Sequence, residues 1–223
     1  MTYGKSIGKK FYEDGSVRRY PGNTIIANIP RDSEAQRIMV ELKRMVIDSG
    51  LGDNYIFLPE DSYHMTVIRG VNDQVRREGF WPDTLAKDSS MSEVDDHIVS
   101  AVESVGMLGR VRMRFSEMYH GGSALVALLE PYDSDEERKL RGFRNAVAEA
   151  IGLFLPKHDE YKYHVSLAYI RIVPEGDDRV RLDDLMGRMN ELLRTQSAFE
   201  TEEPFVAFYD DMLRFSPQRI PRN

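Results

Sequence analysis

The chain repeats one pattern of elements twice. Runs of aliphatic and β-branched residues, which favour strands, begin at Asn23 (NTIIANI) and at Ser123 (SALVALL). In each half, a helix-like segment follows the run, and then a second strand-like segment that contains a histidine. His64 follows Asn23, and His164 follows Ser123, at the same separation of 41 positions. A spacing kept over a whole strand–helix–strand unit indicates an internal duplication.

The segment between the two strands of each half has the signals of an amphipathic helix. Ser33 with Gln36, and Ser134 with Glu137, have the spacing of a capping box. Apolar residues follow at helical spacing in both halves, and a glycine ends each run. Each unit therefore predicts a helix that packs its apolar face against a sheet.

The order of these elements predicts an α/β (α+β) fold of two similar lobes. One more helix-like and one more strand-like segment complete each lobe; they are 96–105 and 110–115 in the first half, and 182–193 and 205–215 in the second. We expect pseudo-two-fold symmetry and a central cleft between two antiparallel sheets. The chain is then a single bilobal domain, residues 1–223, with lobe one at about 21–120 and lobe two at about 121–223.

Two segments fall outside the repeat. Residues 10–20 have the pattern of a hairpin, with Asp14 and Gly15 at its turn. Residues 71–94 form a long polar segment that contains Trp81 and has no counterpart in the second half. Loops of this length in compact domains are often lids or binding loops, and a disordered insertion is the alternative.

The composition excludes several classes of protein. With 30 basic and 37 acidic residues, the net charge of −7 argues against extended, sequence-independent coating of nucleic acid. The absence of cysteine excludes disulfides and thiolate chemistry, and it favours a cytoplasmic location. Neither a signal peptide nor a membrane span is predicted. Because P-loop, GxGxxG and HExxH patterns do not occur, we expect no cofactor and no metal site.

The second strand of each half carries a His-x-Thr/Ser triplet, which is HMT from His64 and HVS from His164. Because side chains alternate along a strand, the histidine and the hydroxyl of one triplet point to the same face, about 6.6 Å apart. One such triplet is expected by chance, but two at equivalent places in a duplicated unit indicate a shared site. The predicted catalytic residues are therefore His64, His164, Thr66 and Ser166.

Two histidines and two hydroxyls suit displacement at phosphorus. The reaction needs a base that activates the attacking oxygen and an acid that protonates the leaving oxygen. Histidine, with an ordinary pKa near 6.5, supplies either form near neutral pH, and general acid–base catalysis contributes roughly 10²- to 10⁴-fold. The hydroxyls of Thr66 and Ser166 would hold the non-bridging phosphate oxygens.

The sequences YHMTVIRG and YHVSLAYI, in two related halves, resemble the two-histidine (2H) phosphoesterase superfamily. This superfamily includes the RNA 2′,3′-cyclic phosphodiesterases once called 2′-5′ RNA ligases, and the resemblance spans nearly the whole chain. Further motifs look like a branch known only as a domain of unknown function; they are Lys10-Phe11, Asp14-Gly15, Pro21-Gly22-Asn23-Thr24 and Trp81-Pro82. The chain departs from the commoner pattern at Ser166, which replaces a threonine, and at Arg69.

The resemblance implies a bilobal fold and a metal-independent phosphodiester hydrolase in which His64 and His164 divide the acid and base roles. The expected substrate is a 2′,3′-cyclic phosphate on a nucleotide or RNA end, and we expect a monomer. The alternative is a non-catalytic nucleotide-binding module that uses the same cleft. Retention of both histidines and both hydroxyls favours the enzyme.

Four further residues are candidates for substrate binding. Asn23 begins the first strand of the repeat, where a turn or capping role explains it almost as well. Arg69 follows the first triplet. Trp81 lies in the long polar segment and Tyr169 follows the second triplet; aromatic faces such as theirs stack on bases, and simple packing is the alternative for both.

Overall fold

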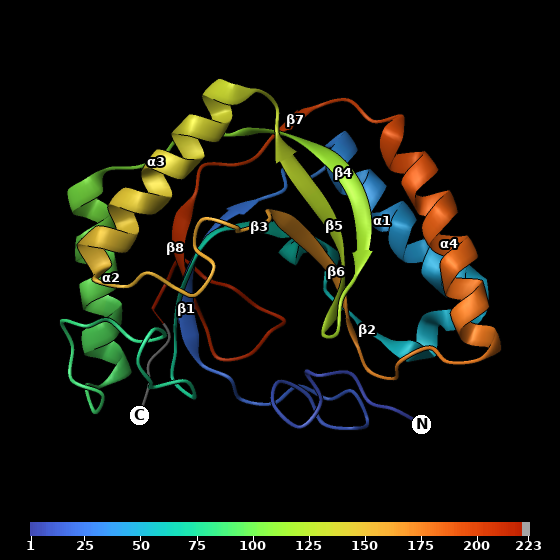
Figure 1. The fold of residues 1–223 in the computed structure, drawn as a ribbon, viewed down its shortest axis with the longest axis horizontal. Helices are drawn as coiled ribbons and strands as arrows, with labels where there is room; N and C mark the ends of the chain where they lie inside the picture. Colours follow the sequence, from blue (N-terminus) through green and yellow to red (C-terminus); the bar gives the residue numbers. More distant parts are fainter. Residues whose placement is uncertain (220–223) are drawn as a thin grey trace.

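An antiparallel β-sheet runs through both halves of the chain (Figure 1). The computed structural model describes residues 1–219; residues 220–223, at the end of the predicted second lobe, lie outside the described residues. The strands are β1 (Gly22–Asn28), β2 (Tyr55–Phe57), β3 (His64–Asn72), β4 (Arg112–His120), β5 (Ala124–Pro131), β6 (His164–Ile170), β7 (Phe199–Glu200) and β8 (Phe205–Tyr209). Their order is β7-β4-β5-β6-β3-β1-β8, and β2 pairs with β6. The predicted mixed α/β fold is confirmed.

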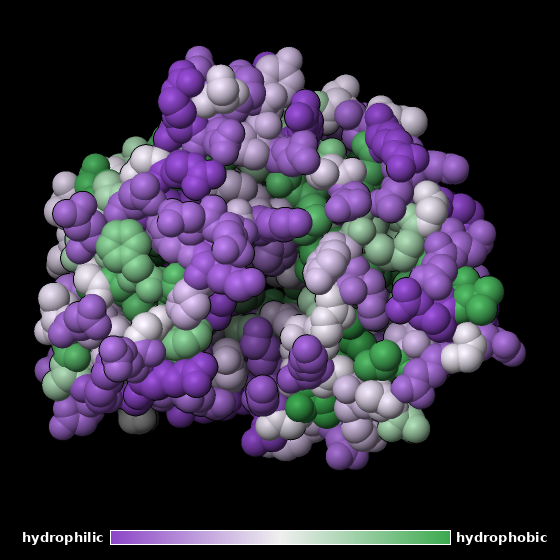
Figure 2. Space-filling view, in the orientation of Figure 1, coloured by the Kyte–Doolittle hydropathy of each residue, from purple (hydrophilic) through white to green (hydrophobic). Residues whose placement is uncertain are grey.

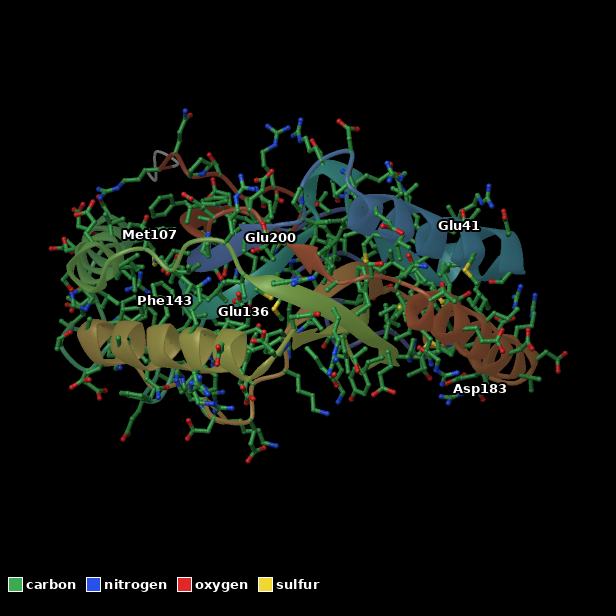
Figure 3. All side chains as sticks on the ribbon, turned by 90° about the horizontal axis from the view of Figure 1, so that it is seen from above. Glu41, Met107, Glu136, Phe143, Asp183 and Glu200 are labelled. Atoms are coloured by element: carbon green, nitrogen blue, oxygen red, sulfur yellow. The ribbon has the colours of Figure 1, made fainter. Side chains whose placement is uncertain are left out.

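Helices flank the sheet at both ends of the molecule. They are α1 (Glu34–Val46), α2 (Met91–Val105), α3 (Ser134–Ile151) and α4 (Asp177–Arg194), with short π- or 3₁₀-helical turns at Ile47–Leu51, Gly52–Asn54 and Glu60–Ser62. Seen from above, α1 and α4 lie together at one end and α2 and α3 at the other (Figure 3). Within residues 1–219, no helix combines the length and the apolar character that crossing a membrane requires.

The helix starts follow the sequence signals with one correction. Ser33 caps α1 by accepting from the Gln36 backbone N–H, as predicted. The cap of α3 is Asp133 instead of Ser134, because the carboxylate accepts from two backbone N–H groups of the first turn. A complete capping box at the start of α2, Ser90 with Glu93, was not predicted.

The last strand of each half pairs with the first strand of the other half. The first half ends in β4, which pairs with β5, and the second half ends in β8, which pairs with β1. The helices follow the same exchange, since α1 contacts α4 and α3 contacts α2. The predicted lobe boundaries at 21–120 and 121–223 therefore assign β4 and β8 to the wrong sheet halves. Alternation of polar and apolar residues identifies a strand but does not identify its partner.

The prediction of two separate sheets also needs correction, because β3 and β6 pair at the centre and join the halves into one sheet. Their pairing is short, with a single pair of opposed residues, Met65 and Val165. The space-filling view shows that the face seen in Figure 1 is hollowed near its centre and covered largely by hydrophilic side chains (Figure 2).

Residues 10–18 form a short hairpin within the predicted 10–20 segment, although the pairing is too short to count as a strand. An antiparallel bridge joins Phe11 to Val17, and the backbone N–H groups of Arg18 and Tyr12 donate to the carbonyl oxygens of Lys10 and Ser16, both at 2.8 Å. Gly15 lies at the predicted turn with a φ of 90°. Phe11 is fully buried in a small apolar cluster with Tyr209 and Met212. This cluster holds the segment against the sheet, together with the hydrogen bond that the Tyr20 backbone N–H donates to the Asp210 carbonyl oxygen at 2.6 Å.

Candidate active site

The two triplets meet at the centre of the sheet. Their middle residues, Met65 and Val165, are opposed in the antiparallel pairing of β3 with β6. In such a pair the neighbouring residues also face each other, so each histidine lies across from the hydroxyl residue of the other triplet. Met65 and Val165 are fully buried in the core, as alternation predicted. The two histidines and two hydroxyls share the opposite face and border one pocket.

Each triplet is followed by a β-bulge. Val67 is the extra residue where β3 pairs with β1, and Leu167 is the extra residue where β6 pairs with β5. Because an extra residue shifts the alternation by one, the side chain three positions after the hydroxyl residue now shares its face. Arg69 and Tyr169 consequently border the same pocket as the histidines. The structure brings both of these predicted residues to the site, at equivalent positions of the two halves.

The two imidazoles are held in the same tautomer. Nδ1 of His64 lies 2.7 Å from the Ser62 carbonyl oxygen, and Nδ1 of His164 lies 2.9 Å from the Lys162 carbonyl oxygen. A carbonyl oxygen can only accept, so Nδ1 carries the proton in both rings. In the neutral form of each ring, Nε2 then keeps its lone pair and can act as a base.

The site also disfavours positive charge on the imidazoles. Burial lowers the pKa of His64 to about 4, and the proximity of His164 contributes in the same direction. Burial likewise lowers the pKa of His164, and the positive charge of Arg69 adds to this effect. In both residues the backbone carbonyl partner opposes the decrease. At neutral pH the free protein therefore holds both imidazoles uncharged.

The pocket has a volume of about 200 Å³ and contains two cations. Lys10 and Arg69 line it, whereas no acidic side chain of residues 1–219 does. The remaining lining residues are mainly aromatic, hydroxyl and amide side chains, including Tyr20, Asn72, Tyr161, Tyr209, Met212 and Phe215. A positive pocket in a chain of net charge −7 favours an anionic ligand.

Several lining residues were not predicted as site residues, among them Lys10, Tyr161 and Phe215. The ring of Phe215 packs against the His64 ring, with 4.5 Å between centroids. The hydroxyl of Tyr161 donates to the Thr66 carbonyl oxygen at 3.2 Å. Each comes from a segment outside the triplets, and the local sequence gives no signal that the fold directs it to the histidines.

The buried side chain of Arg144, on α3, hydrogen-bonds to the backbone next to the first triplet. Arg144 is only 5% exposed and donates to the carbonyl oxygens of Val67 and His158. Its guanidinium also lies over the Tyr161 ring, 4.3 Å from the centroid. Arg144 and Tyr161 therefore satisfy backbone carbonyls at the bulge that turns Arg69 toward the pocket.

Asn23 borders the pocket, but its amide is engaged by the protein. Nδ2 donates to Asp95 at 2.8 Å, and Oδ1 accepts from the Val71 backbone N–H at 2.8 Å. The residue is 1% exposed. A buried amide must be hydrogen-bonded, and these bonds tie β1 to β3 and α2. They account for Asn23 without a ligand, and its contact with substrate stays a prediction.

Trp81 does not reach the pocket, which corrects its prediction as a substrate-stacking residue. Its side chain is fully buried, and Nε1 donates to the Ala86 carbonyl oxygen at 3.0 Å. The guanidinium of Arg76 covers the ring, 4.4 Å from its centroid. The large ring is the packing centre of the 73–90 loop, which explains why a polar segment contains it. Neither a lid nor a binding loop is needed to account for this residue.

The described residues contain no group of three or more His, Asp or Glu side chains that could hold a metal ion. Metal independence remains a prediction.

Two solved structures are among those with a similar overall fold. One is a conserved protein of unknown function, ATU0111 from Agrobacterium tumefaciens strain C58; the TM-score is 0.87 at 23% identity, over 96% of this chain and 91% of that one. The other is TT0787 of Thermus thermophilus, with a TM-score of 0.50 at 14% identity, over 83% of this chain and 86% of that one. At these identities the likeness concerns the fold alone. No curated protein matches the chain.

The family is shown by the sequence itself. Residues 10–124, slightly more than half of the chain, match the family model 2H-phosphodiest, a domain of unknown function (DUF1868). The matched segment contains Lys10, His64 and Thr66, and the second triplet follows it in the duplicated half. The resemblance inferred from the paired triplets is thereby confirmed, and the chain belongs to the 2H-phosphodiest (DUF1868) family of the 2H phosphoesterase superfamily.

Proposed function

We propose that this protein is a metal-independent phosphodiesterase that hydrolyses a 2′,3′-cyclic phosphate on a nucleotide or RNA end. The observation that carries the proposal is the paired geometry of His64 and His164. Both rings are held through Nδ1 by a backbone carbonyl, which leaves Nε2 for chemistry in a pocket that also contains the hydroxyls of Thr66 and Ser166 and no carboxylate among the described lining residues. Acid–base catalysis of phosphoryl displacement requires two such groups.

In this mechanism the histidines divide the two proton transfers. Nε2 of one neutral histidine takes a proton from water, whose oxygen attacks the phosphorus. The bond from phosphorus to the 2′ or 3′ oxygen breaks, and Nε2 of the other, protonated histidine gives its proton to that oxygen. The product is a phosphomonoester with a free neighbouring hydroxyl. Thr66 and Ser166 donate to the non-bridging oxygens, on which negative charge increases.

The proposal requires one imidazole to be protonated although burial lowers the pKa of both. A phosphate anion beside the rings raises the pKa of each, because an opposite charge at short distance favours the protonated form. Substrate binding is therefore coupled to uptake of a proton. Both imidazoles are uncharged in the free protein, and one of them is protonated in the complex with substrate, where it can serve as the general acid.

We expect a bell-shaped pH profile of kcat/KM with its maximum below pH 6.5, the ordinary pKa of histidine. kcat/KM reports the groups of the free enzyme, and in the free protein the pKa of His64 is lowered to about 4 and that of His164 is also lowered. At more acid pH the base is protonated, and at higher pH the acid is lost. In the Arg69→Met variant the alkaline limb should move upward, since Arg69 lowers the pKa of His164. A wild-type maximum above pH 8 would contradict this assignment.

The function is tested by a screen of 2′,3′-cyclic nucleotides and of 2′-5′- and 3′-5′-linked dinucleotides in the presence of EDTA. We expect turnover of the cyclic phosphates that EDTA does not diminish and that the double variant His64→Ala/His164→Ala lacks. Equal turnover by the double variant would exclude the two-histidine mechanism. Binding of the nucleotides by calorimetry without any product would instead identify a nucleotide-binding module.

We also propose a cytoplasmic monomer as the working form. The absence of cysteine fits a reducing compartment, and the pocket is completed by residues of a single chain. Sedimentation at micromolar concentration tests the oligomeric state.

A further inference from the structure

The pocket holds more positive charge than one phosphodiester needs. Lys10 and Arg69 both line it, and neither has an ion pair with any carboxylate of residues 1–219. A phosphodiester carries a single negative charge, and Thr66 and Ser166 already provide donors for its oxygens. Two further cations at the same pocket therefore have no counterpart in the proposed reaction.

Lys10 is held in the pocket by its surroundings. Its Nζ lies 3.4 Å from the Tyr169 hydroxyl, 4.9 Å from the centre of the Tyr169 ring and 5.3 Å from that of Tyr20. The next residue, Phe11, is fully buried and anchors the segment. A lysine with this fixed position has lost much of its side-chain freedom, which is a cost that a merely solvated lysine does not bear.

Lys10 and Arg69 line the same pocket and repel each other. Burial lowers the pKa of Lys10 to about 8, and the charge of Arg69 contributes to this decrease. Lys10 remains largely protonated at pH 7. Two nearby like charges without a carboxylate between them are unfavourable in the free protein, and a multivalent anion relieves this repulsion.

The two cations break the symmetry of the site. The histidine and the hydroxyl residue of each triplet have counterparts in the other half, but Arg69 corresponds to Tyr169, and Lys10 comes from a segment outside the repeat. The symmetric residues suit a single phosphorus atom between two histidines. The asymmetric pair therefore belongs to another part of the substrate.

We propose that Lys10 and Arg69 form a second anion subsite, which takes a phosphomonoester group on the same molecule that carries the cyclic phosphate. The inference rests on the proposed function, and it names the preferred substrate class as nucleoside 2′,3′-cyclic phosphates that also bear a 5′-phosphate. A phosphomonoester carries up to two negative charges and three acceptor oxygens, which match an ammonium and a guanidinium group.

The test compares adenosine 2′,3′-cyclic phosphate with the same compound phosphorylated at the 5′ position. In wild-type protein the 5′-phosphate should raise kcat/KM roughly 10- to 100-fold, the range for hydrogen bonds to charged groups. Lys10→Met and Arg69→Met should each remove most of this preference. The matched control is Lys9→Met, which removes the same charge from an exposed neighbour and should keep the preference. An equal preference in wild type and Lys10→Met would overturn the subsite.

Binding separates this inference from the proposed function. Calorimetry with the His64→Ala/His164→Ala protein measures the dissociation constants of both compounds without turnover. Tighter binding of the 5′-phosphorylated compound that depends on Lys10 supports the subsite even if wild-type protein hydrolyses neither. Turnover of both compounds without any preference would retain the function and reject the subsite. Circular dichroism of Lys10→Met verifies that the variant is folded, and the Arg69→Met variant tests the same subsite from an exposed position.

Discussion

Replacement of His64 by alanine is expected to lower kcat/KM for a 2′,3′-cyclic phosphate by roughly 10²- to 10⁴-fold, the contribution of one general acid or base. The same loss is expected for His164→Ala, because the two rings have equivalent positions and the same tautomer. The double variant should be little worse than either single variant, since each step requires both groups. Single-turnover hydrolysis at several pH values measures these losses.

The matched control for the histidine variants is His97→Ala. His97 lies on α2, outside the pocket, and its ring contacts the Ile151 carbonyl oxygen at 2.8 Å. Because His97 does not border the pocket, its removal should leave kcat/KM of the folded protein unchanged. Comparable losses in all three variants would indicate a general effect on folding. Wild-type activity in His164→Ala would show that the second half of the duplication does not take part in the chemistry.

The second large effect concerns stability. Trp81→Ala is expected to lower the free energy of unfolding by about 3 to 5 kcal/mol, the usual cost of removing a fully buried tryptophan side chain. The variant also leaves the Ala86 carbonyl oxygen without its donor. Because Trp81 does not border the pocket, KM of the folded protein should stay unchanged. Urea unfolding monitored by circular dichroism measures the loss.

Phe80→Ala provides a comparison within the same loop. Phe80 is only half-buried, so its replacement should cost clearly less stability than that of Trp81. A Trp81→Ala variant that keeps its stability but loses affinity for nucleotides would restore the stacking role first predicted from the sequence.

The elements of the fold could largely be predicted, because they follow from local patterns. The strand that contains His64 and the strand that contains His164 both begin within the predicted segments, and their apolar neighbours are buried as alternation requires. Met65 and Val165, for example, lie in the core. The paired triplets also identified the family, since a duplicated motif is informative at two positions at once.

The features that could not be predicted are non-local. Nothing in the period-two pattern reveals that Val67 and Leu167 are bulged, because both are apolar and buried like any core residue. Lys10 reaches the pocket because the next residue, Phe11, packs against Tyr209 and Met212, which lie far away in the sequence. Trp81 was assigned to a binding loop on the polarity of its neighbours, while its burial depends on the tertiary packing of that loop.

The exchange of end strands between the halves has a consequence for cooperativity. If the chain were cut between β4 and β5, the first fragment would contain β1 and β3 without β8, and β4 without β5. Each fragment would expose unpaired strand edges, which are templates for pairing with another chain. The two fragments are complementary, since each holds the strand that the other lacks. A cut between β4 and β5 therefore does not yield two independently folding parts. Two copies of one half could instead form a homodimer in which the end strand of each copy pairs with the first strand of the other.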